Sequence, residues 1–289
     1  MKVKILIPVY NDWQSVSKLI DNINDLLIDP EFEISIIIIN DASNHDRQNE
    51  KKNLENLQSL KIINIKINQG HTRCIATGLK YIYEKEDFDY VIPMDGDGED
   101  RPEEIKELLN QIKNSNGKPI VVERVKRSES LLFKICYQIH KLITLTFTGK
   151  YIKFGNFTCL SRTTVEKMIN EKATWNSFSG SLRKIEIDLI SIPSIRGTRY
   201  FGPSKMSFFN LLKHSLSIIS VFKKTVLIRS SLFIVFYILF IKSNASLITA
   251  IPLILLLIMI YSISSLALRE NLEDFENSLK NIEDIDQIK

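Results

Sequence analysis

Residues 88–100 read FDYVIPMDGDGED, an apolar run that leads directly into a loop of alternating glycines and carboxylates. A short apolar run with polar flanks is typical of a buried parallel strand. The loop carboxylates Asp95, Asp97 and Glu99 repel one another unless a cation or hydrogen-bond donors compensate them. Mg²⁺ takes one or two protein carboxylates and completes its shell with water and phosphate oxygens. The loop therefore indicates a divalent metal site, and the alternative is a solvated acidic turn before a helix that starts near Pro102.

Apolar runs and helical patterns alternate on both sides of this segment. Short apolar runs predict strands over residues 2–9, 33–39, 60–67, 88–94, 118–123 and 185–192. Apolar residues at helical spacing predict helices over 16–27 and 72–84. Because strands alternate with helices, the sequence predicts an α/β fold with an open, mostly parallel sheet.

Polar clusters follow the first four of these strands. They are Tyr10-Asn11-Asp12, Asn40-Asp41-Ala42-Ser43, Asn68-Gln69-Gly70-His71 and the acidic loop at 95–100. Ligands of open parallel sheets bind in the crevice beyond the carboxyl ends of the strands. Any one cluster could be ordinary turn chemistry, since Asn, Asp, Ser and Gly favour loops for local reasons. Their recurrence after four successive strands favours a binding site.

Four segments together resemble family 2 glycosyltransferases of the GT-A fold: Pro8-Val9-Tyr10-Asn11, Asn40-Asp41-Ala42-Ser43, Asn68-Gln69-Gly70 and Met94-Asp95-Gly96-Asp97. The resemblance implies a Rossmann-like catalytic domain that uses a nucleotide diphosphate sugar. It implies that Asp95 and Asp97, helped by Glu99, hold Mg²⁺ or Mn²⁺ on the diphosphate. It also implies that Asp41 contacts the base or ribose, in a nucleotide-sugar pocket formed by Pro8, Tyr10, Asn11, Asp41, Asn68, Gly70 and Asp95.

A later segment, Arg199-Tyr200-Phe201-Gly202-Pro203-Ser204-Lys205, resembles the Arg-x-x-Gly-x-Ser-Lys element of one subgroup of this family. The subgroup includes dolichol-phosphate mannose synthases and bacterial polyprenyl-phosphate glycosyltransferases, which load sugars onto polyprenyl phosphates. The resemblance implies catalytic roles for Asp97, Arg199 and Lys205 and a contact of Ser204 with the acceptor phosphate. The metal loop of the subgroup usually reads Asp-x-Asp-x-Gln, and Glu99 stands in place of the Gln in this chain.

Basic residues also follow the fifth predicted strand, at Arg124 and Arg127. The planar fork of arginine suits phosphate oxygens. Because this strand returns to the predicted active-site edge, the two arginines could neutralise a leaving diphosphate or an incoming phosphate. The alternative is a solvated basic loop, or charges that face a membrane.

The last part of the chain is typical of a membrane anchor. Ser243 to Leu268 carries no charge and is rich in Ile and Leu, and about 20 apolar residues in a helix cross a bilayer core of about 30 Å. Residues 225–241 predict a second span, with Arg229 near one end where it could snorkel to the interface. Positive residues before the first span and after the second predict that both termini lie in the cytoplasm.

These features predict four regions. They are a GT-A domain at 1–206, a basic amphipathic helix on the membrane surface at 207–224, a transmembrane hairpin at 225–268 and a polar cytosolic tail at 269–289. The net charge of +4 is too small to indicate a nucleic-acid partner. Cys74, Cys136 and Cys159 lie far apart and predict reduced thiols rather than disulfides or a zinc site.

The sequence therefore predicts a metal-dependent, inverting glycosyltransferase in the bacterial inner membrane. It would be a multi-pass protein that moves a sugar from a nucleotide diphosphate sugar to a polyprenyl phosphate, and its membrane helices could support an oligomer. One alternative is the same chemistry with a hydroxyl of a lipid-linked glycan as acceptor. Another is a membrane adaptor that keeps the fold without catalysis, which the intact acidic loop disfavours.

Overall fold

The computed structural model describes residues 1–26, 29–45, 47, 53–126, 131–203 and 208–289. Its strands are β1 (Lys2–Val9), β2 (Glu33–Asn40), β3 (Ser59–Ile65), β4 (Tyr90–Pro93), β5 (Ile120–Lys126), β6 (Phe154–Ser161), β7 (Ile190–Ile195) and β8 (Ile282–Gln287). Its helices are α1 (Trp13–Leu26), α2 (His71–Lys85), α3 (Glu103–Ser115), α4 (Leu131–Thr148), α5 (Arg162–Ile169), α6 (Phe178–Ile185), α7 (Phe208–Ser220), α8 (Lys223–Ile241), α9 (Leu247–Ala267) and α10 (Leu272–Glu276). Two 3-10 helices, η1 (Lys172–Trp175) and η2 (Ser278–Asn281), lie beside them.

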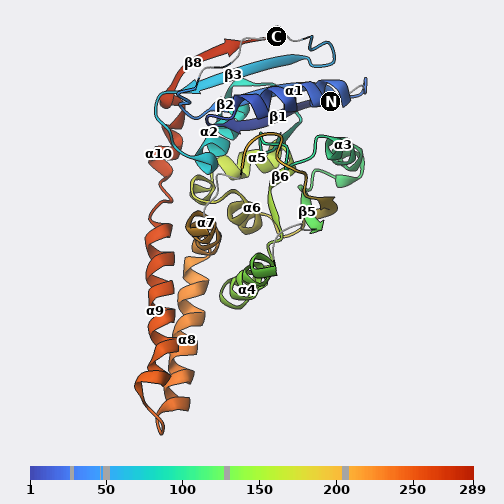
Figure 1. Ribbon diagram of the computed structural model, residues 1–289. Helices are drawn as coiled ribbons and strands as arrows, with labels where there is room; N and C mark the ends of the chain where they lie inside the picture. The colour runs from blue at the N-terminus through green and yellow to red at the C-terminus, as the bar shows by residue number, and fades with distance from the viewer. Residues whose placement is uncertain (27–28, 46, 48–52, 127–130, 204–207) are drawn as a thin grey trace.

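The strands form one sheet in the order β7-β5-β6-β4-β1-β2-β3-β8 (Figure 1). β1 pairs in parallel with β2 and β4, β2 pairs in parallel with β3, and β5 pairs in parallel with β7. β6 runs antiparallel to β4 and β5, and β8 runs antiparallel to β3. The predicted α/β fold with a mostly parallel sheet is confirmed.

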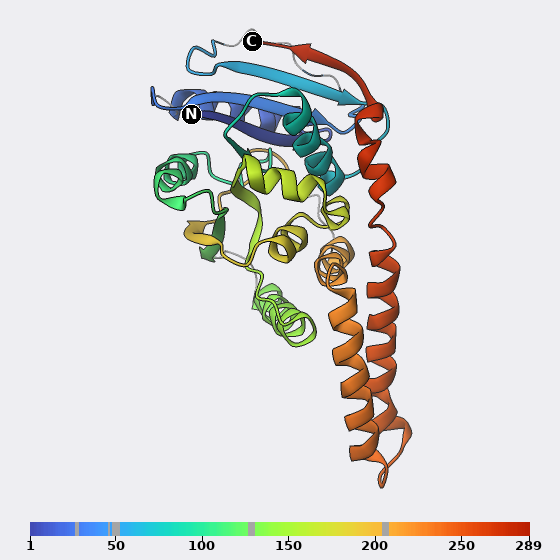
Figure 2. The same cartoon turned by 180° about the vertical axis from the view of Figure 1, so that it is seen from behind.

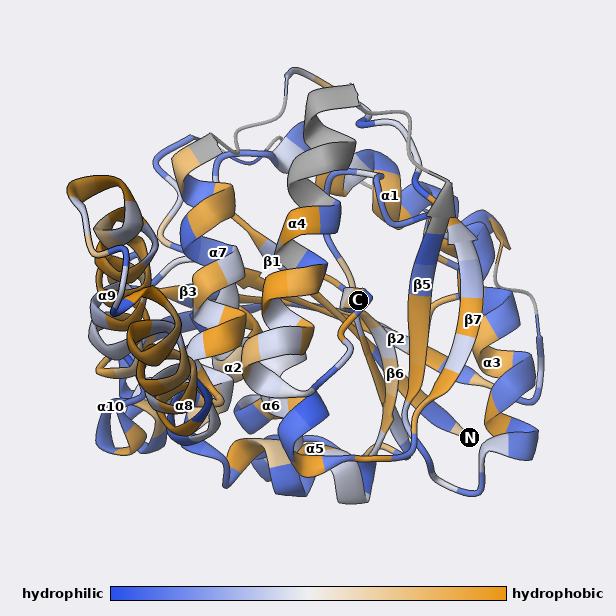
Figure 3. Ribbon diagram, turned by 90° about the horizontal axis from the view of Figure 1, so that it is seen from below, coloured by the Kyte–Doolittle hydropathy of each residue, from blue (hydrophilic) through white to orange (hydrophobic). Residues whose placement is uncertain are grey.

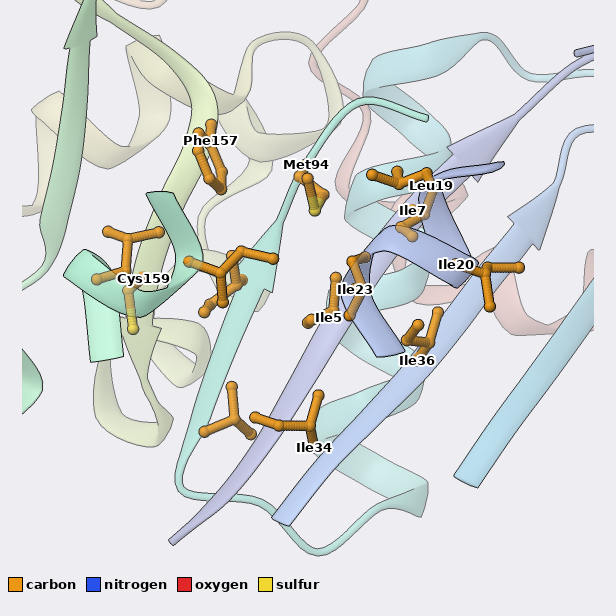
Figure 4. Packing of buried hydrophobic residues seen from close by; sticks show 14 of the residues in the cluster. Ile5, Ile7, Leu19, Ile20, Ile23, Ile34, Ile36, Met94, Phe157 and Cys159 are labelled. Atoms are coloured by element: carbon orange, nitrogen blue, oxygen red, sulfur yellow. The ribbon is translucent and has the colours of Figure 1, made fainter. Parts of the chain in front are cut away.

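Helices cover both faces of the central strands. On one face, Ile5 and Ile7 of β1 pack in the same cluster as Leu19 of α1, as Figure 4 shows. On the other face, Leu6 packs in a cluster with Leu79 of α2. Burial on both faces explains why these strands are continuous apolar runs in the sequence. The close packing fixes the carboxyl ends of β1, β2 and β4, where the polar clusters begin.

The strand predicted at 185–192 is wrong over residues 185–189. Ile185 is the last residue of α6, and residues 186–189 form an irregular connection before β7 begins at Ile190. The N-cap Ser177 of α6 accepts a hydrogen bond from the backbone N–H of Gly180 at 3.3 Å, and α6 packs against α7. Isoleucines at alternate positions match a strand pattern, but the helix already includes the first residue of this segment.

Arg229 attaches α8 to α4. Its Nη1 donates a hydrogen bond to the carbonyl oxygen of Thr146 at 2.7 Å, in the last turn of α4. Gly149, just after α4, has a φ of +70°, and a Cβ there would lie 2.6 Å from Nη2 of Arg229. Arg229 therefore caps the carbonyl end of α4. Its position at a membrane interface stays a prediction.

Helices α8 and α9 form a hairpin that projects from the catalytic domain (Figures 1 and 2). Within the described residues, these are the two helices that are long and apolar enough to cross a membrane. Hydrophobic residues lie around both helices when the hairpin is seen from below (Figure 3). A helix that is apolar on all sides fits a bilayer better than it fits the surface of a soluble domain.

The segment predicted as a polar tail at 269–289 folds back onto the catalytic domain. Phe275 of α10 is buried and stacks on Trp175, with the ring centroids 5.4 Å apart. β8 then adds to the edge of the sheet, with Ile285 opposite Ile63 of β3 (Figure 1). Edge pairing uses backbone hydrogen bonds, so an acidic segment that looks solvated in the sequence can still form a strand. Both ends of the hairpin are therefore attached to the same domain.

This attachment predicts that substitutions at two positions of α10 differ in their effect on the stability of the protein. Phe275→Ala removes a buried ring from the contact with Trp175, and we expect it to destabilise the protein by about 3–5 kcal/mol. Leu272→Ala, at a side chain that is 40% exposed on the same helix, should have little effect. The measurement is the melting temperature of the full chain in detergent. Equal melting temperatures for the two variants would show that this segment does not pack on the domain.

Candidate active site

The acidic loop begins where β4 ends, between β1 and β6 in the middle of the sheet. Met94 is fully buried, and its N–H donates to the carbonyl oxygen of Leu6 at 3.0 Å. Gly96 approaches α1 so closely that a Cβ would lie 2.7 Å from Cγ2 of Val16. Gly98 has a φ of +89°, which is the left-handed region that favours glycine. The two glycines therefore fold the carboxylates tightly against the edge of the sheet.

Asp95 and Asp100 are linked to each other and to cationic side chains from other elements. Oδ1 of Asp95 lies 2.8 Å from Nε2 of His71, the first residue of α2. Asp100 accepts the backbone N–H of Asp95 at 2.9 Å and Nη2 of Arg124, from β5, at 2.8 Å. The loop after β4, the start of α2 and the end of β5 thus meet at these two carboxylates.

Burial and charge shift the pKa values of this group in different directions. Burial favours a neutral Asp95, but the imidazole of His71 outweighs it and holds the pKa of Asp95 well below its usual range. Burial, and then the negative charge of Asp95, raise the pKa of Asp100 against the opposing effect of Arg124. Burial opposes a charge on His71, but Asp95 and Asp100 outweigh burial and raise its pKa. The ion pair between Asp95 and His71 is therefore favoured.

The other two carboxylates of the loop are bound by arginines that follow β7. Arg199 donates from Nη1 to Oδ2 of Asp97 at 2.7 Å, and its Nη2 donates to Asp12 at the start of α1. Arg196 donates from Nε to Oε2 of Glu99 at 2.9 Å. These ion pairs are mostly buried, since the side chain of Arg199 is 15% exposed. One guanidinium therefore bridges the carboxylates that follow β1 and β4.

Residues 196–200, here called the arginine segment, lie along the acidic loop. The backbone N–H of Gly197 donates to the carbonyl oxygen of Glu99, and that of Tyr200 donates to the carbonyl oxygen of Asp97, each at 2.9 Å. The two segments thus contact each other through main chain and side chains. The arginines are held in register with the carboxylates by the backbone as well as by charge.

Asp95 and Asp97 have the chemistry that a divalent metal requires. Both are carboxylates on a glycine-containing loop at the strand ends, and Mg²⁺ and Mn²⁺ prefer such hard oxygen ligands. Across the described ranges, no three His, Cys, Asp or Glu side chains come together as a metal-binding group. Each of the three predicted ligands pairs with a cationic side chain: Asp95 with His71, Asp97 with Arg199 and Glu99 with Arg196. These pairings do not distinguish Glu99 from the other two, and Asp95 and Asp97, with Glu99 beside them, stay the candidate metal ligands.

Asp41 lies where the sequence predicted a nucleotide contact, but its carboxylate is already engaged. It is 3% exposed, and its two oxygens accept the backbone N–H groups of Gln69 and Gly70 at 2.7 and 2.9 Å. Asn68 donates from Nδ2 to the carbonyl oxygen of Asp41 at 2.9 Å. Gly70 has a φ of +86° and is the N-cap residue of α2. Asp41 therefore holds the loop after β3 against the end of β2.

Asn11 ties the loop after β1 to the loop after β2. Its Oδ1 accepts the backbone N–H groups of Asn44 and His45 at 3.0 and 3.1 Å. Asn11 itself has a φ of +52°, a conformation that asparagine tolerates better than most residues. Tyr10 is exposed beside it, while Pro8 is buried within β1. The predicted nucleotide-pocket residues thus lie at the ends of four adjacent strands, β4, β1, β2 and β3.

The structure brings together most of the predicted site. Asp95, Asp97 and Glu99 lie in one loop, and Arg124 and Arg199 bind carboxylates of that loop. The other predicted residues Arg127, Ser204 and Lys205 lie outside the described residues.

The sequence did not predict which side chains bind the carboxylates of the acidic loop. Asp12 and His71 stand in strand-end clusters, but only the structure pairs Asp12 with Arg199 and His71 with Asp95. Asp100 links Asp95 to Arg124. The sequence indicated that Arg196, after the last predicted strand, could neutralise phosphate at the active-site edge, and only the fold places it beside Glu99.

Comparison with known proteins identifies the family of this chain. The profile of Glycosyl transferase family 2 matches residues 4–178. Two undecaprenyl-phosphate 4-deoxy-4-formamido-L-arabinose transferases, from Klebsiella pneumoniae strain 342 and from Klebsiella pneumoniae subsp. pneumoniae strain ATCC 700721 / MGH 78578, are similar. Each is 27% identical over 247 residues, which cover 80% of this chain and 71% of the relative.

A solved structure supports the fold independently. Glucosyl-3-phosphoglycerate synthase from Mycobacterium tuberculosis, in complex with Mn²⁺, uridine-diphosphate-glucose and phosphoglyceric acid, has a TM-score of 0.57. It is 12% identical in sequence, and the match covers 78% of this chain and 79% of that chain. This likeness shows the fold alone. Since the family profile matches more than half of the chain and includes the acidic loop, the chain belongs to glycosyltransferase family 2 and is a glycosyltransferase.

Proposed function

We propose that this glycosyltransferase moves a sugar from a nucleotide diphosphate sugar to a polyprenyl phosphate at the cytoplasmic face of a bacterial membrane. The observation that carries the proposal is the gathering of arginines on the acidic loop. Arg124, Arg196 and Arg199 come from different parts of the chain and all bind carboxylates of this loop. The relatives named above carry undecaprenyl phosphate in their names, which supports a polyprenyl phosphate as acceptor.

Asp95 and Asp97 would hold the divalent metal on the donor diphosphate. The structurally similar synthase was solved with Mn²⁺ and uridine-diphosphate-glucose, which supports a metal and a nucleotide sugar for this chain. When bound, such a metal supplies positive charge that stabilises the leaving diphosphate. His71 keeps Asp95 ionised, and an ionised carboxylate is the form that binds a metal.

Arg199 is placed to serve the phosphates of the reaction. It neutralises both Asp97 and Asp12. A metal on Asp97 would take over part of this neutralisation, and the guanidinium fork could then bind phosphate oxygens. The family resemblance implied a catalytic role for Arg199, and its ion pair with Asp97 supports that role.

The carboxylates of the loop favour a phosphate acceptor over a hydroxyl acceptor. A hydroxyl needs a general base within hydrogen-bond reach. Asp97, Glu99 and Asp100 are each bound by an arginine, and Asp95 is bound by His71. A phosphate monoester has a second pKa of about 6 and is largely ionised near neutral pH without any base. Held in line with the anomeric carbon, it would invert that centre as it displaces the diphosphate.

The hairpin would place the domain at the membrane. α8 and α9 would cross the bilayer, and α7 would lie at its surface with Phe209 and Leu212 exposed. Because β8 returns to the sheet, the two ends of the hairpin lie on the same side of the membrane. The active site would then face the leaflet from which a polyprenyl phosphate presents its head group.

The metal proposal predicts the effect of one substitution. Asp97→Asn keeps the size of the side chain but removes its charge, and we expect sugar transfer to fall at least ~100-fold. Glu107→Gln, at an exposed carboxylate of α3, is the matched control and should retain activity. Excess EDTA should reduce the wild-type rate to a similar extent, and Mn²⁺ or Mg²⁺ should restore it. Unchanged turnover in EDTA would exclude the metal-dependent mechanism.

The acceptor proposal predicts the chemistry of the product. Membranes that contain the protein are incubated with radiolabelled nucleotide sugars, and the labelled lipid is then treated with mild acid. A sugar linked to a lipid phosphate should be released, whereas an ordinary glycoside should survive. Membranes with the Asp97→Asn variant should form little labelled lipid, which controls for host enzymes. A labelled lipid that resists mild acid would favour the hydroxyl acceptor.

The membrane proposal predicts which side of the membrane each loop occupies. Asn244 lies in the turn between α8 and α9, and Asn244→Cys should react with an impermeant maleimide in cells whose outer membrane has been permeabilised. Lys85→Cys, at an exposed site of the catalytic domain, should react only after the inner membrane is opened. The measurement is the labelled fraction of each variant. Equal labelling of both before opening would contradict the topology.

A further inference from the structure

Helix α4 lies at the lower end of the catalytic domain, beside α8 (Figures 1 and 2). Figure 1 shows α4 almost end-on while the hairpin is seen along its length, and Figure 3 shows α4 along its length while the hairpin is seen end-on. α4 therefore runs across the direction of the hairpin. Ile143 and Phe147 of α4 pack in a cluster with Val226 of α8, and the contact of Arg229 with Thr146 fixes the last turn of α4 to α8.

The outward face of the described part of α4 is apolar. Ile139, Leu142 and Leu145 follow one another at three-residue spacing, and they are 52%, 65% and 44% exposed. Gln138 and Thr146 are the exposed polar residues of the same part of the helix. The surface helix of a soluble domain usually turns polar side chains outward and one apolar stripe inward. Since α4 is apolar on its outward face as well, this face indicates an apolar environment outside the domain.

Lysines and a tyrosine lie close to this face. The ring centroid of Tyr151, a side chain that is 43% exposed, lies 5.2 Å from Nζ of Lys141 and 4.4 Å from Nζ of Lys153. Lys150 precedes Tyr151 in the chain, and Glu123 lies 3.8 Å from Nζ of Lys153, so the cluster keeps a net positive charge. Lysines attract anionic lipid head groups, and tyrosine is enriched at the same depth of a membrane. An anionic leaflet therefore complements both the charge and the apolar face.

We propose that the exposed face of α4 lies in the membrane leaflet that the hairpin crosses, and that anionic phospholipids hold it there. Arg229 lies six residues after Lys223, so α4 contacts α8 about 9 Å along that helix from its start. An amphipathic helix in a membrane surface buries its apolar face by a similar depth, about 5–10 Å. This inference rests on the membrane placement of the hairpin proposed above.

A contact of α4 with the leaflet would fix the active site relative to the membrane. α4 is the helix that follows β5, and Arg124 of β5 binds Asp100 of the acidic loop. α7 is the helix that follows the arginine segment. The two segments that supply arginines to the acidic loop would therefore each lead into a helix that lies on the leaflet. A polyprenyl phosphate presents its head group at the same surface.

Fluorescence quenching in lipid nanodiscs tests the contact. The full chain carries Cys136→Ser, and an environment-sensitive fluorophore is attached to one added cysteine. The positions are Leu142→Cys on α4, Leu257→Cys in the middle of α9 and Lys85→Cys, an exposed site of α2. The chain without an added cysteine gives the background from the buried Cys74 and Cys159. The lipids carry nitroxide groups at different depths of their acyl chains.

We expect each position to be quenched at its own depth. Shallow nitroxides should quench the label at Leu142→Cys most strongly, because a helix in the membrane surface does not reach the bilayer centre. Deep nitroxides should quench the label at Leu257→Cys, and neither should quench the label at Lys85→Cys.

The lipid composition tests the role of the lysines. Quenching at Leu142→Cys should increase when phosphatidylglycerol is added to discs of phosphatidylcholine. Lys141→Gln should weaken this response about fivefold, the effect of one lysine near an anionic surface. Lys106→Gln, at an exposed lysine of α3, is the matched control and should respond like the unsubstituted chain. The measurement is the fraction of phosphatidylglycerol that gives half of the increase.

The possible failures are distinguishable. An unquenched label at Leu142→Cys beside a quenched label at Leu257→Cys would overturn the contact and would leave this face of α4 open to another protein. Equal quenching with and without phosphatidylglycerol would overturn the role of anionic lipids. An unquenched label at Leu257→Cys would overturn the membrane placement of the hairpin and this inference with it. No sugar transfer is measured, so none of these results decides the proposed reaction.

Discussion

Four carboxylates lie within the six residues 95–100, and each is compensated by a cationic side chain from another part of the chain. His71 comes from the start of α2 and Arg124 comes from β5. Arg196 and Arg199 come from the segment after β7. Removing one of these cations would leave a partly buried carboxylate without a partner, and this would lower the free energy of unfolding. The loops around the end of β4 are therefore assembled by this charge balance, and the site exists only when all of these elements are in place.

The same charge balance determines how ligands can enter. In the proposed reaction a donor diphosphate would add negative charge and a divalent metal would add positive charge. Their binding would therefore exchange the ion-pair partners of the loop carboxylates. Arg199 is central to this exchange, since it binds Asp97 and Asp12 from the ends of two different strands. The arginine segment is also fixed by main-chain hydrogen bonds, so the exchange can occur at the side chains while the backbone of the loop stays in place.

The hairpin is a second constraint, because the chain leaves the sheet through α7 and α8 and returns to it through α10 and β8. Attachment at both ends, together with the cap of Arg229 on α4, restricts rotation of the hairpin relative to the sheet. If the hairpin crosses a membrane as proposed, the active-site edge would keep one orientation toward the bilayer.

The sequence by itself determined the central strands, the two apolar helices and the acidic loop. These features are local, since buried strands are continuous apolar runs and carboxylates in a glycine-containing loop are visible without any partner. Tertiary structure alone decided the pairing of Glu99 with Arg196 and the return of β8 to β3. It also decided that Arg229 caps α4. Each of these depends on residues far apart in the chain, or on backbone hydrogen bonds that leave no pattern in the side chains, so periodicity and composition do not contain them.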